Sequence, residues 1–298
     1  MRIVVSGGSG FLGGSVTRVL RAAGHQVIVL TRRATREGDL TWSPASEGGA
    51  WVAAVQAADV VINLAGEGIA DKRWSESRRE AILRSRVAAT RALAGALRDA
   101  VRPATFISGS AVGYYGVGDD EKTEADRPGA DFLARVCVEW EREATAIGNA
   151  TRVVLLRTGV VLARDGGALP RMALPFHFFA GGRVGSGRQF LSWIHLDDWI
   201  ALVLWTIEHA RIAGPLNLTA PQPVRNLEFT RTLARVLNRP AVMPVPAFAL
   251  RLALGELADT ALLAGQRVMP AVATAAGYEF RYPGLEDALT AIYSGRPT

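Results

Sequence analysis

A glycine-rich turn near the amino terminus narrows the possible folds more than any other segment. Residues 2–6 are a short apolar run, and apolar residues with helical spacing follow from residue 11 onward. Three glycines, Gly7, Gly10 and Gly13, lie between these segments and in the first helical turn. Glycines at such a turn let the pyrophosphate of a dinucleotide reach the backbone N–H groups of the helix. Their spacing differs from the common G-x-G-x-x-G form, and an ordinary turn is the alternative, but the flanking strand and helix favour nucleotide binding.

Short apolar runs alternate with helical segments over the first 165 residues. The expected strands are residues 2–6, 26–30, 59–64, 105–108 and 152–156. The expected helices are residues 11–23, 51–57, 75–98 and 131–146. Such alternation is typical of parallel strands joined by right-handed helical crossovers. The sequence therefore predicts an α/β fold, with a Rossmann-type doubly wound parallel sheet in a dinucleotide-binding domain over residues 1–165.

The pattern loosens after residue 165 into loops rich in glycine and proline. Helices are expected at residues 196–209, 226–237, 247–263 and 285–293, with a strand at 216–219. Asn226 is the expected amino-terminal cap of the second of these helices. We therefore predict a smaller, mostly helical substrate lobe over residues 166–298, with a segment near residues 190–220 that returns to the first domain.

Composition excludes several classes of protein. Because Cys137 is the single cysteine, neither an internal disulfide nor a cysteine-rich metal site is possible, and a reducing cytoplasm fits best. No apolar run reaches the about 18 residues of a membrane-spanning helix. The apolar run after Met1 is too short for a signal peptide. We expect a soluble cytoplasmic protein in which Cys137 is a buried, inert thiol.

The formal net charge of +6 raises the question of a nucleic-acid partner. Basic residues are spread along the chain, and their densest run, residues 73–91, is interleaved with Glu76 and Glu80 as on a solvated helix face. No nucleic-acid-binding motif accompanies them, so we expect neither a nucleic-acid nor a membrane partner. A small anionic ligand explains the charge better.

Residues that follow the second and third expected core strands indicate which dinucleotide binds. Thr31, Arg32 and Arg33 end the second strand, and no acidic residue follows before Glu37. A guanidinium attracts the 2′-phosphate of NADP, whereas NAD usually requires a carboxylate at this place, so NADP is favoured over NAD. Solvated loop charges are the alternative. After the third core strand, the small residues of the segment Leu64, Ala65 and Gly66 let the adenosine lie against the sheet edge.

Several motifs, in this order and spacing, resemble the extended short-chain dehydrogenase/reductase superfamily. They are the turn at residues 7–13 and the segments at residues 63–66, 108–111 and 192–198. More narrowly, residues 110–116 and the tail from 216 to 289 resemble the atypical epimerase-like branch. The resemblance covers nearly the whole chain. It implies a nicotinamide cofactor and a substrate lobe of the kind found in nucleotide-sugar epimerases. It also implies cofactor contacts by Phe11, Leu12, Ser108, Arg157 and Gly159, although Ser108 is also readable as a structural strand end, and Arg157 as a ligand for an anionic substrate.

The chain departs from the superfamily in its catalytic residues. Typical members use a Tyr-x-x-x-Lys pair, but Lys72 and Lys122 are the only lysines, and neither has a tyrosine four residues before it. Ser110 matches the superfamily's catalytic serine. Tyr114 or Tyr115 can supply the missing phenol, as an acid more readily than as a base because no lysine lowers its pKa. Packing in the loop is the alternative for both tyrosines.

Other polar residues are candidates for the substrate site. Glu67 follows the third core strand, and Arg183 and Arg188 lie in a glycine-rich loop where they can contact an anionic substrate. His195, followed by Asp197 and Asp198, lacks histidine partners for a metal, so no metal site is predicted, and a structural role is favoured over catalysis. The helices at residues 75–98 and 131–146 are candidates for pairing in a homodimer.

Two functional interpretations follow. The first is an NADP-dependent oxidoreductase, or an isomerase that uses NADP as a bound redox relay, built around Ser110 and a tyrosine. The second is a non-catalytic NADP-binding redox sensor or partner-binding regulatory protein. Loss of the tyrosine–lysine pair favours the sensor, whereas retention of Ser110 and of an elaborate carboxy-terminal lobe favours the enzyme.

Overall fold

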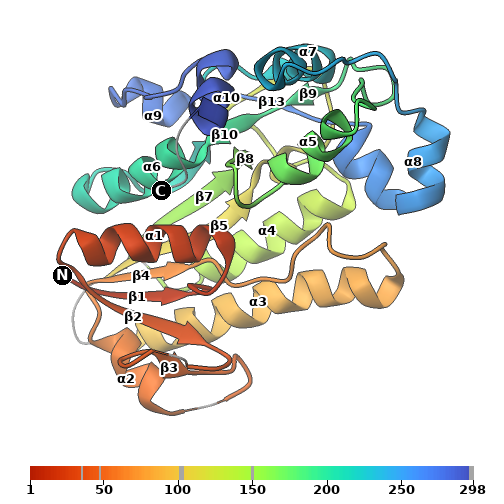
Figure 1. Ribbon diagram of the computed structural model, residues 1–298. Helices are drawn as coiled ribbons and strands as arrows, with labels where there is room; N and C mark the ends of the chain where they lie inside the picture. Colours follow the sequence, from red (N-terminus) through yellow and green to blue (C-terminus); the bar gives the residue numbers. More distant parts are fainter. Residues whose placement is uncertain (35, 47, 101–103, 149–150, 295–298) are drawn as a thin grey trace.

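A seven-stranded parallel sheet forms the centre of the computed structural model, which describes residues 1–34, 36–46, 48–100, 104–148 and 151–294 (Figure 1). The strand order is β11-β7-β5-β4-β1-β2-β3. The strands are β1 Arg2–Ser6, β2 Gln26–Thr31, β3 Leu40–Thr41, β4 Val60–Asn63, β5 Thr105–Ala111, β7 Arg152–Thr158 and β11 Gly214–Leu218. This order, with helical crossovers between the strands, confirms the predicted Rossmann-type doubly wound sheet.

Helices cover both faces of the sheet, as continuous apolar strands require. Figure 1 shows α1 (Phe11–Ala22) and α6 (Leu196–Glu208) on one face, and α3 (Glu76–Arg98) and α4 (Phe132–Thr145) on the other, where α2 (Ala50–Gln56) also packs. Successive residues of β1 serve the two faces: Ile3 packs in the cluster that contains α1 and α6, and Val4 in the cluster that contains α2 and α3. The period of two therefore directs successive side chains in the middle of the strand into cores on opposite faces of the sheet.

The carboxy-terminal lobe is helical around short strand pairs. Its helices are α5 Leu169–His177, α7 Asn226–Leu237, α8 Ala247–Leu254, the π-helical turn Ala258–Leu262, α9 Ala271–Ala275 and α10 Leu285–Ser294. The short strands are β6 Glu121–Lys122, β8 Val160–Leu162, β9 Phe190–Leu191, β10 Trp193–His195, β12 Val224–Arg225 and β13 Arg267–Val268, and a 3-10 turn spans Val112–Tyr115. After the excursion to β10 and α6, the chain returns to the sheet as β11, beside β7.

Four individual elements differ from what the sequence predicted. Helix α5 lies in a region that was expected to be loop. The helix expected at 247–263 is broken at Gly255, whose φ of +62° ends α8, and helical structure resumes up to Leu262. Asn226 does not cap α7, because its side-chain oxygen accepts a hydrogen bond from the Val184 N–H at 2.9 Å instead. The strand expected at 105–108 is also longer, since β5 continues to Ala111.

None of the helices in the described ranges is long and apolar enough to cross a membrane. Helices α3 and α4 pack against each other within the chain, and an ion pair joins Arg91 to Glu143 at 2.8 Å. Their pairing between two subunits stays a prediction.

Candidate functional site

The glycine turn is too tightly built for any other residue at two of its positions. Gly7 has a φ of +78°, and a Cβ at this position would lie 2.6 Å from the backbone carbon of Leu64. A Cβ on Gly13 would overlap the Gly7 carbonyl, whose carbon would be 2.7 Å away. The Gly10 N–H donates to the Gly7 oxygen at 3.0 Å and closes the turn. The turn is therefore a cradle of bare backbone at the start of α1.

The amino terminus of α1 is free to bind an anion. Gly10 is its N-cap, no side chain caps the helix, and its first turn holds no acidic residue. The unpaired N–H groups and the helix dipole favour negative charge there. Phe11 does not point away from the protein: its ring packs on the loop of Gly166 and Gly167, where a Cβ would come within about 3 Å of ring atoms. Leu12 packs against the core.

Arg32 and Arg33 lie exposed after β2, and Arg32 lines a surface hollow. Neither guanidinium bonds another residue in the described ranges, and the Thr31 hydroxyl accepts the Arg33 N–H in a loose turn at 3.5 Å. The hollow has a volume of about 450 Å³ and is lined by Arg32, Thr41, Trp42, Ser43, Ser46, Gly48, Gly49, Ala50 and Trp51. The sequence pattern revealed only Arg32 among these, because the two tryptophans and the serines carry no motif.

The segment after β4 forms the other wall of the glycine cradle. The Leu64 N–H donates to the Ser6 carbonyl at 2.9 Å, which continues the sheet register beyond β4. The Asn63 carboxamide oxygen accepts from Ala65 N at 3.2 Å, and its nitrogen donates to the Thr90 hydroxyl at 2.8 Å. Asn63 therefore fixes Ala65 against the turn, so that residues 64–66 and the glycine cradle share one edge of the sheet.

Ser110 belongs to a buried polar cluster. Its hydroxyl donates to a Glu141 oxygen at 2.6 Å. Arg157 binds the same carboxylate with two hydrogen bonds, at 2.9 and 2.8 Å. Burial opposes the charge of Arg157, but the hydrogen bonds and charge of Glu141, helped by Tyr115, outweigh it and raise its pKa. We call Ser110, Tyr115, Glu141, Arg157 and Asn217 the inner polar cluster.

The two candidate tyrosines differ in what their hydroxyls contact. The Tyr115 hydroxyl donates to Asn217 at 2.7 Å and accepts from Arg157 at 3.0 Å. Burial, the largest effect, raises the pKa of Tyr115 to about 12. Tyr114 is half-buried, its ring lies under the Arg157 guanidinium at 3.4 Å, and its hydroxyl bonds no other residue in the described ranges. Tyr114 is therefore the phenol with a free hydroxyl.

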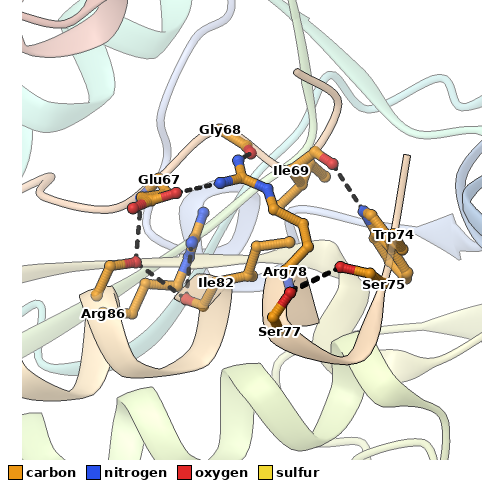
Figure 2. A network of polar contacts seen from close by, with 10 residues as sticks. Glu67, Gly68, Ile69, Trp74, Ser75, Ser77, Arg78, Ile82 and Arg86 are labelled. Atoms are coloured by element: carbon orange, nitrogen blue, oxygen red, sulfur yellow. Dashed lines mark hydrogen bonds and ion pairs between the residues drawn. The ribbon is translucent and has the colours of Figure 1, made fainter. Parts of the chain in front are cut away.

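A polar network holds the loop that follows Gly66 (Figure 2). Figure 2 shows Arg78 pointing toward Glu67 and the Gly68 carbonyl, with which it forms an ion pair and a hydrogen bond. The Trp74 indole donates to the Ile69 carbonyl at 2.8 Å. The Glu67 carboxylate is thus already ion-paired with Arg78 of α3, so it is not a free group for a substrate.

The remaining predicted residues are not all in one place. Ser108 is fully buried inside β5, and Arg157 belongs to the inner polar cluster instead of lying free at a cofactor surface. The Gly159 N–H donates to the Leu218 carbonyl. A Cβ at position 159 would lie 2.5 Å from the Ser192 carbonyl oxygen, so close backbone packing is enough to require glycine there. Arg183 bonds the carbonyl of Gly185 at 2.6 Å.

The Arg183 side chain packs beside Gly187, where a Cβ would be 3.4 Å from it, so it lies next to the backbone that carries Arg188. Arg188 itself lines a hollow of about 220 Å³, whose lining residues are Val117, Gly118, Asp119, Arg188, Gln189, Leu263, Ala264 and Gly265. Both arginines are exposed. Contact of these two arginines with an anionic substrate stays a prediction.

His195 and Asp198 serve the packing of the carboxy-terminal segment. The His195 ring accepts the Asp197 N–H at 3.0 Å at the start of α6, and burial lowers the pKa of His195. Asp198 accepts the N–H groups of Arg281 and Tyr282 at 2.8 and 2.9 Å. The described residues contain no cluster of three metal-ligating side chains. Cys137 is buried, and burial raises the pKa of its thiol to about 11, as an inert thiol requires.

The sheet order, the glycine cradle and the uncapped α1 define a dinucleotide-binding α/β protein of the Rossmann type. A model described as the NAD dependent epimerase/dehydratase family matches residues 3–218, and a domain of unknown function, DUF1731, matches residues 245–292. The chain therefore belongs to the NAD-dependent epimerase/dehydratase family. The second match confirms the predicted atypical epimerase-like branch with its distinctive carboxy-terminal region.

Relatives match along almost the full chain. The epimerase family protein ML0860 of Mycobacterium leprae is 42% identical over 291 residues, which cover 97% of this chain and 94% of that protein. A crystal structure of the human epimerase family protein SDR39U1 with NADPH has a TM-score of 0.91 and 35% identity, covering 99% of this chain and all of that chain. A nucleoside-diphosphate sugar epimerase of Corynebacterium glutamicum has a TM-score of 0.80 and 34% identity, covering 97% of this chain and 57% of the other.

Proposed function

We propose that this protein binds NADP(H) and uses it as an oxidoreductase or epimerase-like enzyme on a small carbonyl or hydroxyl substrate. The observation that carries the proposal is the glycine cradle, where Gly7 and Gly13 leave no space for a Cβ and the N–H groups of α1 are uncapped. These residues fit a pyrophosphate. The similarity to human SDR39U1, which was crystallised with NADPH, supports NADP over NAD.

Arg32 and Arg33 bind the 2′-phosphate in this proposal. Both residues are exposed, and Arg32 lines the hollow that Trp42 and Ser43 also line. Planar guanidinium groups bind phosphate with paired hydrogen bonds, so two of them favour NADP over a dinucleotide that lacks this phosphate.

The chain's own residues supply the proton chemistry. The nicotinamide ring supplies hydride transfer when it is bound. Tyr114 donates the proton through its free hydroxyl, and the Ser110 oxygen accepts a hydrogen bond from the substrate while the Ser110 O–H continues to donate to Glu141. Tyr115 positions Arg157 and does not exchange a proton, because burial holds its pKa near 12.

Titration of the purified protein with NADPH and NADH, followed by nicotinamide fluorescence, tests the binding. Arg32→Ala with Arg33→Ala is expected to weaken NADPH binding at least tenfold and to leave NADH binding unchanged. Arg18→Ala, an exposed arginine on α1, is the matched control. If the double variant binds NADPH as tightly as the parent protein, the two arginines do not hold the phosphate. If the parent binds neither dinucleotide, the proposal itself is wrong.

A second function, that of a non-catalytic NADP(H) sensor, is favoured by one observation. The Ser110 hydroxyl, Glu141 and Arg157 form a closed, buried cluster, so the predicted catalytic serine is already bonded. Oxidation of bound NADPH by a panel of carbonyl compounds separates the two functions. Turnover that Tyr114→Phe lowers at least a hundredfold supports the enzyme, whereas tight binding with no oxidation supports the sensor.

A further inference from the structure

Arg86 lies on α3 beside Gly66, in the segment that follows β4 at the same edge of the sheet as the glycine cradle. Its side chain reaches from α3 to Gly66, where a Cβ would be 3.1 Å from the guanidinium carbon and 3.3 Å from Nη1. On its other side, the guanidinium carbon lies 5.2 Å from the centre of the Trp140 ring on α4. The guanidinium is therefore held between bare backbone and an aromatic ring.

The hydrogen-bonding capacity of Arg86 is largely unused. In the described part of the chain, its one hydrogen bond runs from Nη1 to the Ile82 carbonyl at 3.0 Å. A guanidinium has five N–H donors. Its neighbour Arg78 takes the carboxylate of Glu67 instead, as Figure 2 shows, and no described carboxylate is ion-paired with Arg86.

The surroundings of Arg86 oppose its charge. Burial is the main effect that lowers the pKa of Arg86, and the charge of Arg78 lowers it further. Glu67 and Cys137 act in the opposite direction without cancelling this effect. Arg86 is partly exposed, and a cation that is partly withdrawn from water without an ion pair gains from a ligand that supplies the missing hydrogen bonds.

The position of Arg86 indicates what that partner is. Gly66 belongs to the segment whose residues 64 and 65 line the glycine cradle. The Trp140 ring that Arg86 contacts packs over Gly109, where a Cβ would be 2.8 Å from the ring, and Gly109 adjoins Ser110. Arg86 thus lies between the cradle and the strand end that carries Ser110, on the opposite side of the cradle from Arg32.

We propose that Arg86 binds the nicotinamide half of NADP(H), with its free N–H groups donating to ribose or phosphate oxygens of that half. This inference rests on the proposed function, since the cradle must first hold the pyrophosphate. A dinucleotide that places its adenosine near Arg32 and its pyrophosphate at the cradle extends its other half toward β5, where Arg86 lies. The ligand then completes the hydrogen bonds that the chain leaves open.

The test compares two ligands and three variants. NADPH carries both halves, whereas adenosine 2′,5′-bisphosphate carries only the adenosine half. Arg86→Gln is expected to weaken NADPH binding about tenfold, the loss typical of one hydrogen bond to a charged group. Binding of adenosine 2′,5′-bisphosphate is expected to be unchanged. Arg86→Lys keeps the charge but loses the planar fork, so it is expected to weaken NADPH binding less. Arg84→Gln is the matched control, because Arg84 lies on the same helix with an exposed side chain.

The outcomes separate this inference from the proposed function. If the parent protein binds NADPH and Arg86→Gln binds it equally well, the inference is wrong and the proposed function stands. Equal weakening of both ligands also overturns the inference, because the contact would then not be with the nicotinamide half. If the parent binds no NADPH, both fail. Removal of a poorly partnered buried charge is not expected to lower the melting temperature, and if Arg86→Gln does unfold, Arg86→Lys carries the comparison.

Discussion

Arg157 is buried and Arg86 is partly buried near the same edge of the sheet, but the chain gives the two guanidinium groups opposite surroundings. Arg157 is 2% exposed, is bonded by both oxygens of Glu141, and has its pKa raised. Arg86 has one carbonyl partner, and its pKa is lowered. A buried charge that the chain itself completes serves stability, whereas a charge that the chain leaves incomplete is available to a ligand.

Glu141→Ala is the largest expected perturbation of this comparison. It leaves Arg157 buried without its carboxylate, so we expect the free energy of unfolding in urea to fall by about 3–5 kcal/mol. Glu139→Ala serves as the control, because Glu139 lies two residues earlier on α4 with a side chain that is 37% exposed. A loss for Glu141→Ala no larger than that for Glu139→Ala would show that Arg157 does not depend on Glu141.

Gly13→Ala tests the part of the molecule that the chain leaves open to a ligand, the glycine cradle. The new Cβ overlaps the Gly7 carbonyl, so the turn must shift, at a cost of roughly 1–3 kcal/mol of stability. NADPH binding, measured by fluorescence titration, is expected to be lost. Gly14→Ala is the control, because its Cβ would lie at an ordinary 3.5 Å from the nearest atom. Unchanged NADPH binding in Gly13→Ala would contradict the role of the cradle.

Tyr115→Phe sharpens the comparison within the inner polar cluster. It removes the hydroxyl that joins Arg157 to Asn217, so we expect a loss of about 1 kcal/mol in the free energy of unfolding. Tyr114→Phe, whose hydroxyl has no such partners, is expected to be neutral in the same urea titration. Equal effects of the two variants would mean that the hydrogen bonds of Tyr115 contribute nothing measurable.

The same tyrosine predicts a pH dependence. The pKa of Tyr115 is about 12 in the folded chain and about 10 when unfolded, so the folded state holds the proton longer. Stability is therefore expected to fall as the pH rises from 10 toward 12, and to fall less steeply in Tyr115→Phe. Burial also raises the pKa of Tyr278, so part of the decline persists in the variant.

Cys137 gives the smallest expected effect. Its thiol donates to the Ala111 carbonyl at 3.6 Å, and the nearby charge of Arg86 lowers the pKa of the thiol less than burial raises it. Because burial raises the pKa of the thiol to about 11, we expect labelling by a disulfide reagent at pH 8 to be much slower in the folded protein than in urea. Rapid labelling of the folded protein would show that the region around Arg86 opens to solvent.

Local patterns were enough to predict the sheet and the cradle. A continuous apolar run is enough to predict a strand such as β4, and the spacing of Gly7 and Gly13 between a strand and a helix is enough to predict the turn. Partners that join distant segments were not predictable. Glu141 lies on α4, 31 residues from Ser110. From the sequence alone, a carboxylate on an amphipathic helix is predicted to face solvent, so its contact with Ser110 was not expected. Arg86 was not singled out for the same reason, because the arginines of α3 were all predicted to face solvent. Helix α5 was missed because Pro170 and Pro175 resemble loop signals, although the first stands in the first turn.

The late return of β11 to the sheet has a consequence for the order of synthesis. β11 pairs with β7 only after residue 214 has been made, and α6, which covers one face of the sheet with Trp199 and Leu202, also follows residue 195. A nascent or truncated chain that stops near residue 165 therefore exposes both the outer edge of β7 and an apolar sheet face. Unpaired strand edges of this kind promote aggregation. We expect the amino-terminal segment to need the carboxy-terminal one before it becomes a stable folding unit.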